Sequence, residues 1–312
     1  MKKVYIILLL FNLILANNVI TTGQQHQVNL NFSNENKIIG NIEIGDIEYS
    51  ILSIEGNEYL QLNIPESYNS RFIGNPALPQ INNLIEIPRG ADISIDIIYT
   101  EQVEFDLNTI SNKIKIYPSQ PSISKSDKTE NKKFIINALS YLKNQNLGFD
   151  LVQIENKGLL REIEIGNLII SPIKYNPIEE KLIIYKNIEF AIHFNNVDSN
   201  RIKQIKQKYT SPYFETIYES SLINYNANST RDNDFIHDQV TYLIIAEQSF
   251  NGYLDEFINW KTQKGYNVIT AYTNEIGSSS SSIRSFIQEN YSNPPENLSP
   301  VSFVLLVGDT AQ

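Results

Sequence analysis

The sequence predicts a β-rich antiparallel sandwich followed by an incomplete α/β domain built on a parallel sheet. Between residues 37 and 194, short runs of alternating apolar and polar residues are separated by turn residues. After residue 240, continuous apolar runs alternate instead with helical patterns. Period-two alternation is typical of half-buried strands, whereas β-α-β order is typical of parallel sheets. The 312 residues are enough for about two such domains.

The first 23 residues are predicted to be a signal peptide. Two lysines precede the run Val4–Leu15, which is apolar apart from one asparagine. A membrane-spanning helix needs about 20 apolar residues, so this run has the length of a signal h-region. Small residues allow cleavage after Ala16 or after Gly23. We expect a secreted or cell-surface protein of a Gram-negative bacterium, without a transmembrane anchor. The alternative is an uncleaved signal anchor.

The sandwich is predicted to span residues 24–225. Alternating apolar residues mark its strands, as in the run 188–194, and Gly, Asn and Pro mark the turns between them. About ten such strands favour two packed antiparallel sheets. The polar segment 117–133 interrupts the pattern. It is interpreted as a surface loop, with a processing or partner loop as the alternative.

Two short helices are predicted at the end of this region. Apolar residues recur with helical spacing in residues 202–209 and again, after Pro212, in residues 214–222. The first helix carries basic residues on a face that we expect to be solvated: Arg201, Lys203, Lys206 and Lys208.

A linker at residues 226–239 is predicted to lead into the N-terminal part of an α/β domain, residues 240–312. Its buried strands are expected at residues 242–246, 268–272 and 303–307, because these runs are apolar and rich in β-branched or aromatic residues. Three parallel strands leave a sheet unfinished. The sequence is therefore interpreted as a truncated piece of a longer protein.

Helices are predicted between these strands. Ser249 is expected to cap the first helix, and Trp260 is expected to pack within it. The serine run 278–282 is expected to cap the second helix. It lacks the Gly-x-x-x-x-Gly-Lys frame of a phosphate-binding loop.

The end of the third strand is where chemistry is expected in this part. In open parallel sheets, ligands bind beyond the carboxyl ends of the strands. Asp309 follows the third strand and Gly308, so it is a candidate for a cation- or substrate-binding strand-end loop. The favoured alternative is a turn residue that accepts hydrogen bonds from the local backbone.

Composition excludes several kinds of site. The chain has no Cys, which rules out disulfides, thiolate metal sites and a cysteine nucleophile within it. Its three histidines, His26, His193 and His237, are too few and too scattered to favour a metal site. A net charge of −10 argues against nucleic acid as a partner, because nucleic-acid binding needs dense Lys and Arg.

Several motifs, in their order along the chain, resemble the gingipain-type cysteine peptidases of family C25 and their propeptide. In the C-terminal part, they are residues 254–265 (LDEFINWKTQKG) and 303–309 (FVLLVGD). In the sandwich, they are residues 74–90, which contain GNPALP and LIEIPRG, and residues 170–177 (ISPIKYNP). The resemblance covers most of the chain after the signal peptide.

The resemblance implies a β-sandwich propeptide followed by a caspase-like peptidase domain that uses a Cys nucleophile and a His base. An imidazole beside the thiol raises the reactive thiolate fraction. Neither residue of that pair matches a position in this chain, so no catalytic residue is assigned in it. No cofactor or metal ligand is assigned either, although the resemblance allows a structural calcium in the complete peptidase domain.

The leading hypothesis is the N-terminal fragment of a secreted cysteine endopeptidase zymogen, whose propeptide aids folding and inhibits the peptidase until it is cleaved. The partners would be its own peptidase domain and, for the parent protein, protein or peptide substrates. One alternative is a sortase-like surface peptidase of the bacterial export machinery. Another is a non-catalytic secreted β-sandwich that acts as a binding module.

Arg231 is the candidate processing site. It is the only Lys or Arg between Lys208 and Lys261, and it lies in the predicted linker. Exposed polar linkers are preferred sites of proteolysis. The alternative is a solvated charge without a role in processing.

Overall fold

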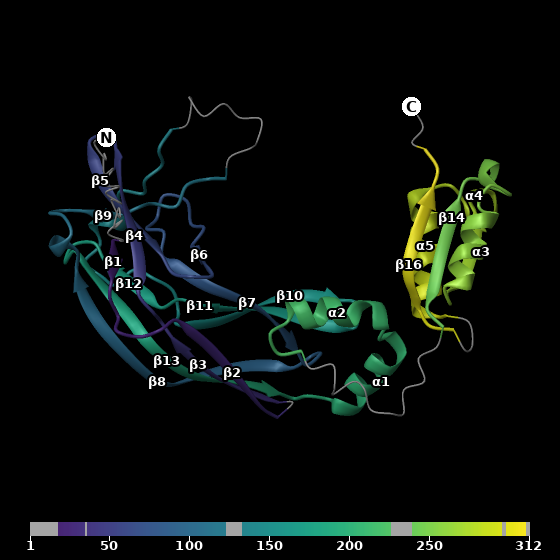
Figure 1. The fold of residues 1–312 in the computed structure, drawn as a ribbon, viewed down its shortest axis with the longest axis horizontal. Helices are drawn as coiled ribbons and strands as arrows, with labels where there is room; N and C mark the ends of the chain where they lie inside the picture. The colour runs from purple at the N-terminus through teal and green to yellow at the C-terminus, as the bar shows by residue number, and fades with distance from the viewer. Residues whose placement is uncertain (1–17, 35, 123–132, 226–238, 295–297, 310–312) are drawn as a thin grey trace, which may run out of the picture. The chain divides into compact units, whose positions relative to one another are not determined.

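The computed structural model describes most of the chain after residue 17 (Figure 1). The described residues are 18–34, 36–122, 133–225, 239–294 and 298–309. Most of the predicted signal peptide, part of the predicted polar loop, and the linker residues 226–238 with Arg231 and His237 lie outside them.

These residues fall into two compact units. The first is drawn from residues 1–82, 93–155 and 168–193. The second is drawn from residues 83–92, 156–167 and 194–312.

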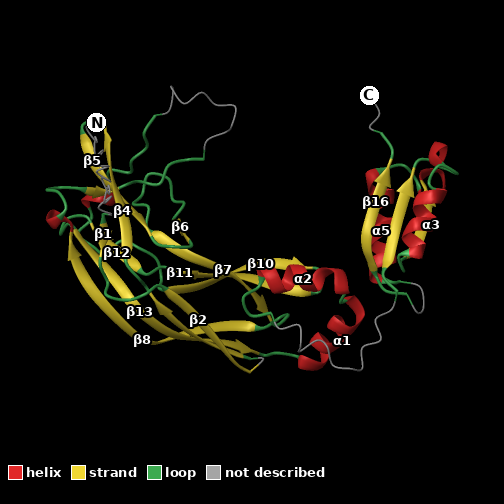
Figure 2. Ribbon diagram, viewed as in Figure 1, coloured by secondary structure: helices red, strands yellow, loops and turns green. Residues whose placement is uncertain are grey.

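Strands β1 to β13 form three sheets that are largely antiparallel (Figure 2). The first sheet contains, in order, β1 (Val19–Ile20), β4 (Ile47–Ile54), β5 (Asn57–Asn63) and β9 (Lys115–Ile116). The second contains β10 (Val152–Leu160), β11 (Ile163–Ile170), β7 (Pro79–Ile87) and β6 (Ser67–Asn69). The third contains β12 (Ile173–Asn176), β13 (Lys181–Asn195), β3 (Lys37–Glu43) and β2 (Gln27–Asn34), and β8 (Asp92–Asp106) pairs with β13. The predicted antiparallel β-rich region is confirmed, with a short parallel pair between β5 and β9 as an exception.

Alternation along the strands builds the core, as β3 shows. Ile38, Gly40 and Ile42 are buried, and the two residues between them are only partly covered. On the partner strand β13, Ile188 pairs with Ile42 and is fully buried. Successive side chains of a strand point to opposite faces, so one face of each strand enters the core. Burying each such side chain contributes about 1.5–3 kcal/mol.

Strand β1 ties the start of the described chain to the first sheet. Ile20 pairs with Ile47 of β4 and is only 2% exposed. The backbone N–H of Thr22 donates to Asp46 at 2.9 Å. The segment that directly follows residue 17 is therefore part of the folded sheet.

Helices α1 (Ser199–Tyr209) and α2 (Pro212–Ser221) follow the strands, as the sequence predicts. The carboxylate of Asp198 accepts a hydrogen bond from the N–H of Arg201 and so caps α1. Pro212 begins α2, where its missing N–H has no helical partner to lose. Tyr218 of α2 packs with Leu222 and with Ile163 of β11, so these helices belong to the second unit.

The C-terminal part has the predicted parallel sheet, in the order β15-β14-β16. Its elements are β14 (Thr241–Ala246), α3 (Asp255–Gln263), β15 (Asn267–Tyr272), α4 (Thr273–Ile276), α5 (Ser280–Ser292) and β16 (Val301–Val307). Helix α5 packs against Leu243 and Ile245, whereas Phe257 of α3 contacts Tyr242. Because neighbouring side chains of a strand alternate, the two helices cover opposite faces of the sheet (Figure 2).

The serine run caps α5, but the expectation that Ser249 caps the first helix is wrong. Ser279 accepts a hydrogen bond from the N–H of Ser282. Ser249 instead lies in a short 3-10 turn that Glu247 caps, and α3 begins only at Asp255. Trp260 packs within α3, its ring centroid 5.6 Å from that of Phe257, although its side chain is 46% exposed.

Candidate functional site

The carboxyl ends of the parallel strands bring Glu247 and Asp309 to one edge of the sheet, which we call the carboxyl edge. The backbone N–H of Glu247 donates to the carbonyl of Val307 at 3.0 Å, so the ends of β14 and β16 are neighbours. Asp309 is exposed two residues beyond β16. The structure thus places Asp309 where the sequence expects it.

Glu247 is a residue that the sequence reasoning missed. Its carboxylate accepts hydrogen bonds from the backbone N–H and the hydroxyl of Ser249. These hydrogen bonds lower the pKa of Glu247, so the carboxyl edge carries an ionised group. An acidic residue directly after a buried strand is the signal that would have found it. Within the described ranges, no three carboxylate or imidazole groups gather as a metal site.

The opposite end of the sheet contacts the α1–α2 pair through aromatic rings. Tyr213 of α2 stacks on Tyr266, with ring centroids 5.3 Å apart, and meets Phe303 of β16 edge-on at 5.4 Å. Phe214 stacks on Phe303 at 6.3 Å. A hydrogen bond with Tyr213, together with burial, raises the pKa of Tyr266 to about 12. These rings join the end of the predicted propeptide to the start of the predicted peptidase domain.

Arg161 supplies the polar part of the same contact. Its Nε donates to the carbonyl of Tyr209 at 2.9 Å, Nη1 to the carbonyl of Val301 at 3.2 Å, and Nη2 to the hydroxyl of Ser302 at 3.1 Å. The side chain of Arg161 is only 8% exposed. We call Arg161 and these partners the docking contact.

Glu162, next to Arg161, is buried beneath the docking contact. The hydroxyl of Tyr218 donates to its carboxylate at 3.1 Å, and Arg161 Nε lies 3.6 Å from the same oxygen. Burial raises the pKa of Glu162 despite these two favourable neighbours. Burial and the nearby carboxylate also raise the pKa of Tyr218.

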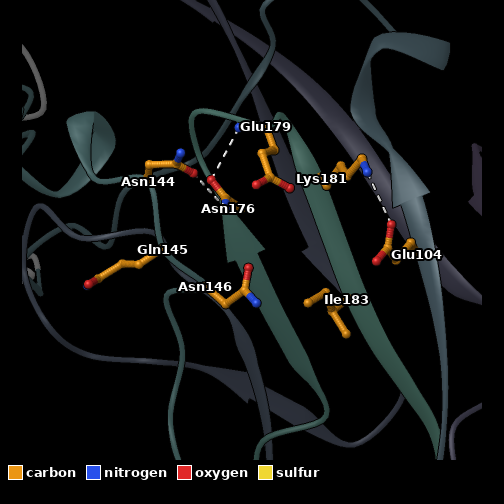
Figure 3. Close-up of a pocket in the computed structure, with 8 residues that line it drawn as sticks. All are labelled: Glu104, Asn144, Gln145, Asn146, Asn176, Glu179, Lys181 and Ile183. Atoms are coloured by element: carbon orange, nitrogen blue, oxygen red, sulfur yellow. Dashed lines mark hydrogen bonds and ion pairs between the residues drawn. The ribbon is translucent and has the colours of Figure 1, made fainter.

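A polar cavity of about 340 Å³ lies in the first unit, between the loop at residues 144–146 and the turn from β12 to β13 (Figure 3). The side-chain oxygen of Asn176 accepts hydrogen bonds from the N–H groups of Ile178 and Glu179, and its amide donates to Asn144 (Figure 3). Lys181 pairs with Glu104 at 3.2 Å. Asn176 thus holds the turn in place and bonds across the cavity to Asn144.

The described histidines do not form a catalytic group. His193 Nε2 lies 3.2 Å from a carboxylate oxygen of Asp96, which links β13 to β8. His26 is partly buried, and burial lowers its pKa. Among the helices that the structure describes, none is both long and apolar enough to cross a membrane.

A β-rich region followed by the first strands of a parallel α/β sheet is the arrangement of a propeptide and the start of its peptidase domain. The chain belongs to peptidase family C25. The family's propeptide model, Propeptide_C25, matches residues 18–232, and the model of Peptidase family C25 matches residues 236–312. The predicted resemblance is therefore confirmed, and neither alternative function is favoured.

Curated relatives come from Porphyromonas gingivalis. Lys-gingipain is 32% identical over 268 residues, which are 85% of this chain and 15% of the relative. Gingipain R2 is 23% identical over 247 residues, which are 78% of this chain and 32% of the relative. The chain thus spans about 15% of the length of the Lys-gingipains that it matches.

Two solved structures share the fold. One, from work on the zymogenic latency of gingipain K from Porphyromonas gingivalis, has a TM-score of 0.54 and 25% identity. It covers 57% of this chain and 98% of the other. The second is a complex of Porphyromonas gingivalis RgpB pro- and mature domains, with a TM-score of 0.53 and 17% identity, covering 64% and 98%. The predicted fold class is confirmed.

Proposed function

We propose that this chain is the N-terminal portion of a secreted gingipain-like cysteine endopeptidase that is made as an inactive zymogen. The propeptide, predicted at residues 24–225, would begin already at residue 17, because β1 pairs with β4. Residues 226–239 would be the linker and residues 240–312 the start of the peptidase domain. The propeptide would help the peptidase domain to fold and would inhibit it until the linker is cut. The observation that carries this proposal is the contact between the α1–α2 pair and the first strands of the parallel sheet.

The parent protein would hydrolyse peptide bonds with groups outside this chain, since these residues hold no Cys. Within the chain, the carboxyl edge would border the substrate cleft, and Asp309 would lie on a strand-end loop beside it. The ionised Glu247 would add negative charge there. The substrate class of the parent is a protein or a peptide.

The test compares the parent protein before and after the linker is cut. We expect hydrolysis of a peptide substrate to be low in the intact zymogen and to rise after cleavage. Full activity of the uncut protein would overturn the inhibitory role. If the rise occurs without any release of the propeptide, a change within the complex is responsible rather than dissociation.

Arg231 is the proposed recognition residue for that cleavage. We expect Arg231→Ala to slow processing in the linker, because it removes the only basic residue there. Arg201→Ala, on the exposed face of α1, is the control for loss of one positive charge. Unchanged cleavage at the same bond in Arg231→Ala would eliminate Arg231 from recognition.

Export would depend on the N-terminal signal peptide, for which the sequence allows cleavage after Ala16 or after Gly23. Of the two cleavage positions, the one after Ala16 is supported by β1, because Val19 and Ile20 pair with β4. Cleavage after Gly23 would remove this strand from the mature protein.

A further inference from the structure

We propose that Arg161 is the anchor that keeps the propeptide attached to the peptidase domain after the linker is cut, at the end of the sheet remote from the carboxyl edge. This inference rests on the proposed zymogen function. It assigns retention of the propeptide and obstruction of the active site to different parts of the molecule.

The hydrogen bonds of Arg161 cross from one part to the other. Its guanidinium donates to a carbonyl at the end of α1 and to two groups at the start of β16, Val301 and Ser302. A planar guanidinium offers five donors in a fixed fork, so one side chain can bond several acceptors at once. Arg161 is little exposed, so losing it would leave three partly buried acceptors without this donor.

One aromatic ring from each part also contacts the guanidinium. Its central carbon lies 5.0 Å from the ring centroid of Phe214 in α2 and 5.5 Å from that of Tyr291 in α5. Guanidinium groups stack on aromatic faces, whereas an ammonium group offers no plane to stack. Lysine would therefore keep the charge of Arg161 but not its contacts.

Lys208 and Tyr209 extend the docking contact along the carboxyl end of α5. Lys208 Nζ donates to the carbonyl of Ser292, the last residue of that helix, at 2.8 Å. Tyr209 stacks on Tyr291 with ring centroids 5.2 Å apart. The carboxyl end of a helix has unpaired carbonyls and partial negative charge, so it favours cations. The carboxyl end of α5 is thus complementary in charge to Arg161 and Lys208 of the propeptide.

The location of Arg161 separates docking from inhibition. It binds at Val301, where β16 starts, whereas the carboxyl edge lies beyond Val307. A strand rises about 3.3 Å per residue, so β16 places about 20 Å between the docking contact and that edge. Arg161 therefore cannot itself block a substrate at the carboxyl edge.

The backbone conformation of Arg161 is unfavourable for an arginine, which indicates that the position is occupied by Arg for its side-chain contacts. It is the first of the two residues that join β10 to β11, with a φ of 60°. Two-residue hairpins usually place Gly, Asn or Asp at such a position, because positive φ is unfavourable for other residues. Replacement by glycine should therefore suit the turn while removing the anchor, together with the contacts of Arg161 to Tyr209, Phe214 and Glu162 within the propeptide.

The experiment uses the full-length parent protein with a recognition sequence for an added protease inserted in the linker. After cutting, with the peptidase thiol blocked, the propeptide is immobilised and release of the peptidase domain is followed over time. We expect the wild-type parts to stay together. Arg161→Gly should release the peptidase domain about thirtyfold faster or more, the loss typical of a buried arginine at the centre of an interface.

Two further variants and a measurement of thermal stability serve as controls for this experiment. Arg161→Lys should also release faster, whereas Arg201→Ala should behave as wild type. Thermal unfolding of the uncut Arg161→Gly protein should show that the sandwich still folds cooperatively. Release of Arg161→Gly at the wild-type rate, or immediate separation of the wild-type parts, would overturn the anchor. Inhibition is measured separately, by peptide hydrolysis of the uncut protein, so a propeptide that stays bound without inhibiting would contradict only the zymogen proposal.

Discussion

The ring of Phe190 on β13 lies over Gly40 on β3, its direct partner in the sheet register. A Cβ atom built on Gly40 would lie 2.2 Å from the ring. Phe190 is fully buried. The missing side chain of Gly40 is therefore what allows this large ring into the core.

We expect Gly40→Ala to destabilise the sandwich by about 1–3 kcal/mol, the usual cost of overpacking a core. Urea unfolding of the purified chain would measure the loss. Adding Phe190→Leu to Gly40→Ala should recover part of it, because the smaller side chain leaves space for the new methyl group. Wild-type stability of the single variant would show that the ring can shift.

His26 should make the stability of the sandwich depend on pH. Neither ring nitrogen of His26 has a hydrogen-bond partner in the described part of the chain. Burial lowers its pKa below the usual 6.5, so the unfolded chain takes up a proton at a higher pH than the folded one. The contribution of neutral His26 is thus present above pH 6.5 and is lost as the pH falls through the lower folded pKa.

Unfolding in urea at a series of pH values between 8 and about 5 would measure this loss. His26→Gln should flatten the dependence on pH, since glutamine does not titrate. Equal curves for wild type and His26→Gln would assign the acid sensitivity to other groups.

Glu162 should give the stability of the sandwich the opposite dependence on pH from that of His26. Burial raises its pKa, so the folded state holds the proton to a higher pH than the unfolded chain does. Stability should therefore fall as the pH rises from the usual 4.5 through the raised folded pKa. Glu162→Gln should remove this fall and still accept the hydrogen bond from Tyr218, whereas Glu162→Leu should cost about 1–3 kcal/mol for the unpaired hydroxyl. Urea unfolding of the three proteins at pH 5 and about pH 8 would distinguish them.

The mature N-terminus should be Asn17. Ile20 is buried against Ile47, and burying such a side chain contributes about 1.5–3 kcal/mol. A chain that starts at Gln24 should therefore unfold at lower urea concentration than one that starts at Asn17. Mass spectrometry of the exported protein would identify the terminus directly, and a terminus at Gln24 would contradict the role of β1.

Local patterns predicted the elements but not the contacts between distant ones. The alternation in β3 and β13, and the apolar run of β14, depend on nearest neighbours and are visible in the sequence. The basic face of α1 was expected to be solvated, but Lys206 pairs with Glu86 at 2.6 Å and Lys208 bonds Ser292. Those partners lie far away along the chain.

Arg161 was overlooked because it occupies a turn, where there is no apolar pattern to read. The sequence signal was the lack of Gly, Asn or Asp between two strands joined by only Arg161 and Glu162. A hairpin that keeps an unfavourable residue at its tip often does so for a side-chain contact. The tertiary fold is needed to show which contact it is.

Strand β1 also has a consequence for the timing of export. If signal peptidase cuts after Ala16, only Asn17 and Asn18 separate the scissile bond from the first paired residue. A protease binds its substrate as an extended stretch of chain. Once the sheet has formed, β1 is held against β4 and is not available for that binding. Cutting must then come before β1 joins the sheet. Because β1 is an edge strand, it can be added last, to strands that have already paired. Pulse-labelled chains caught during export should accordingly be cleaved while β1 is still open to an added protease, and uncleaved chains with a protected β1 would rule out this order of events.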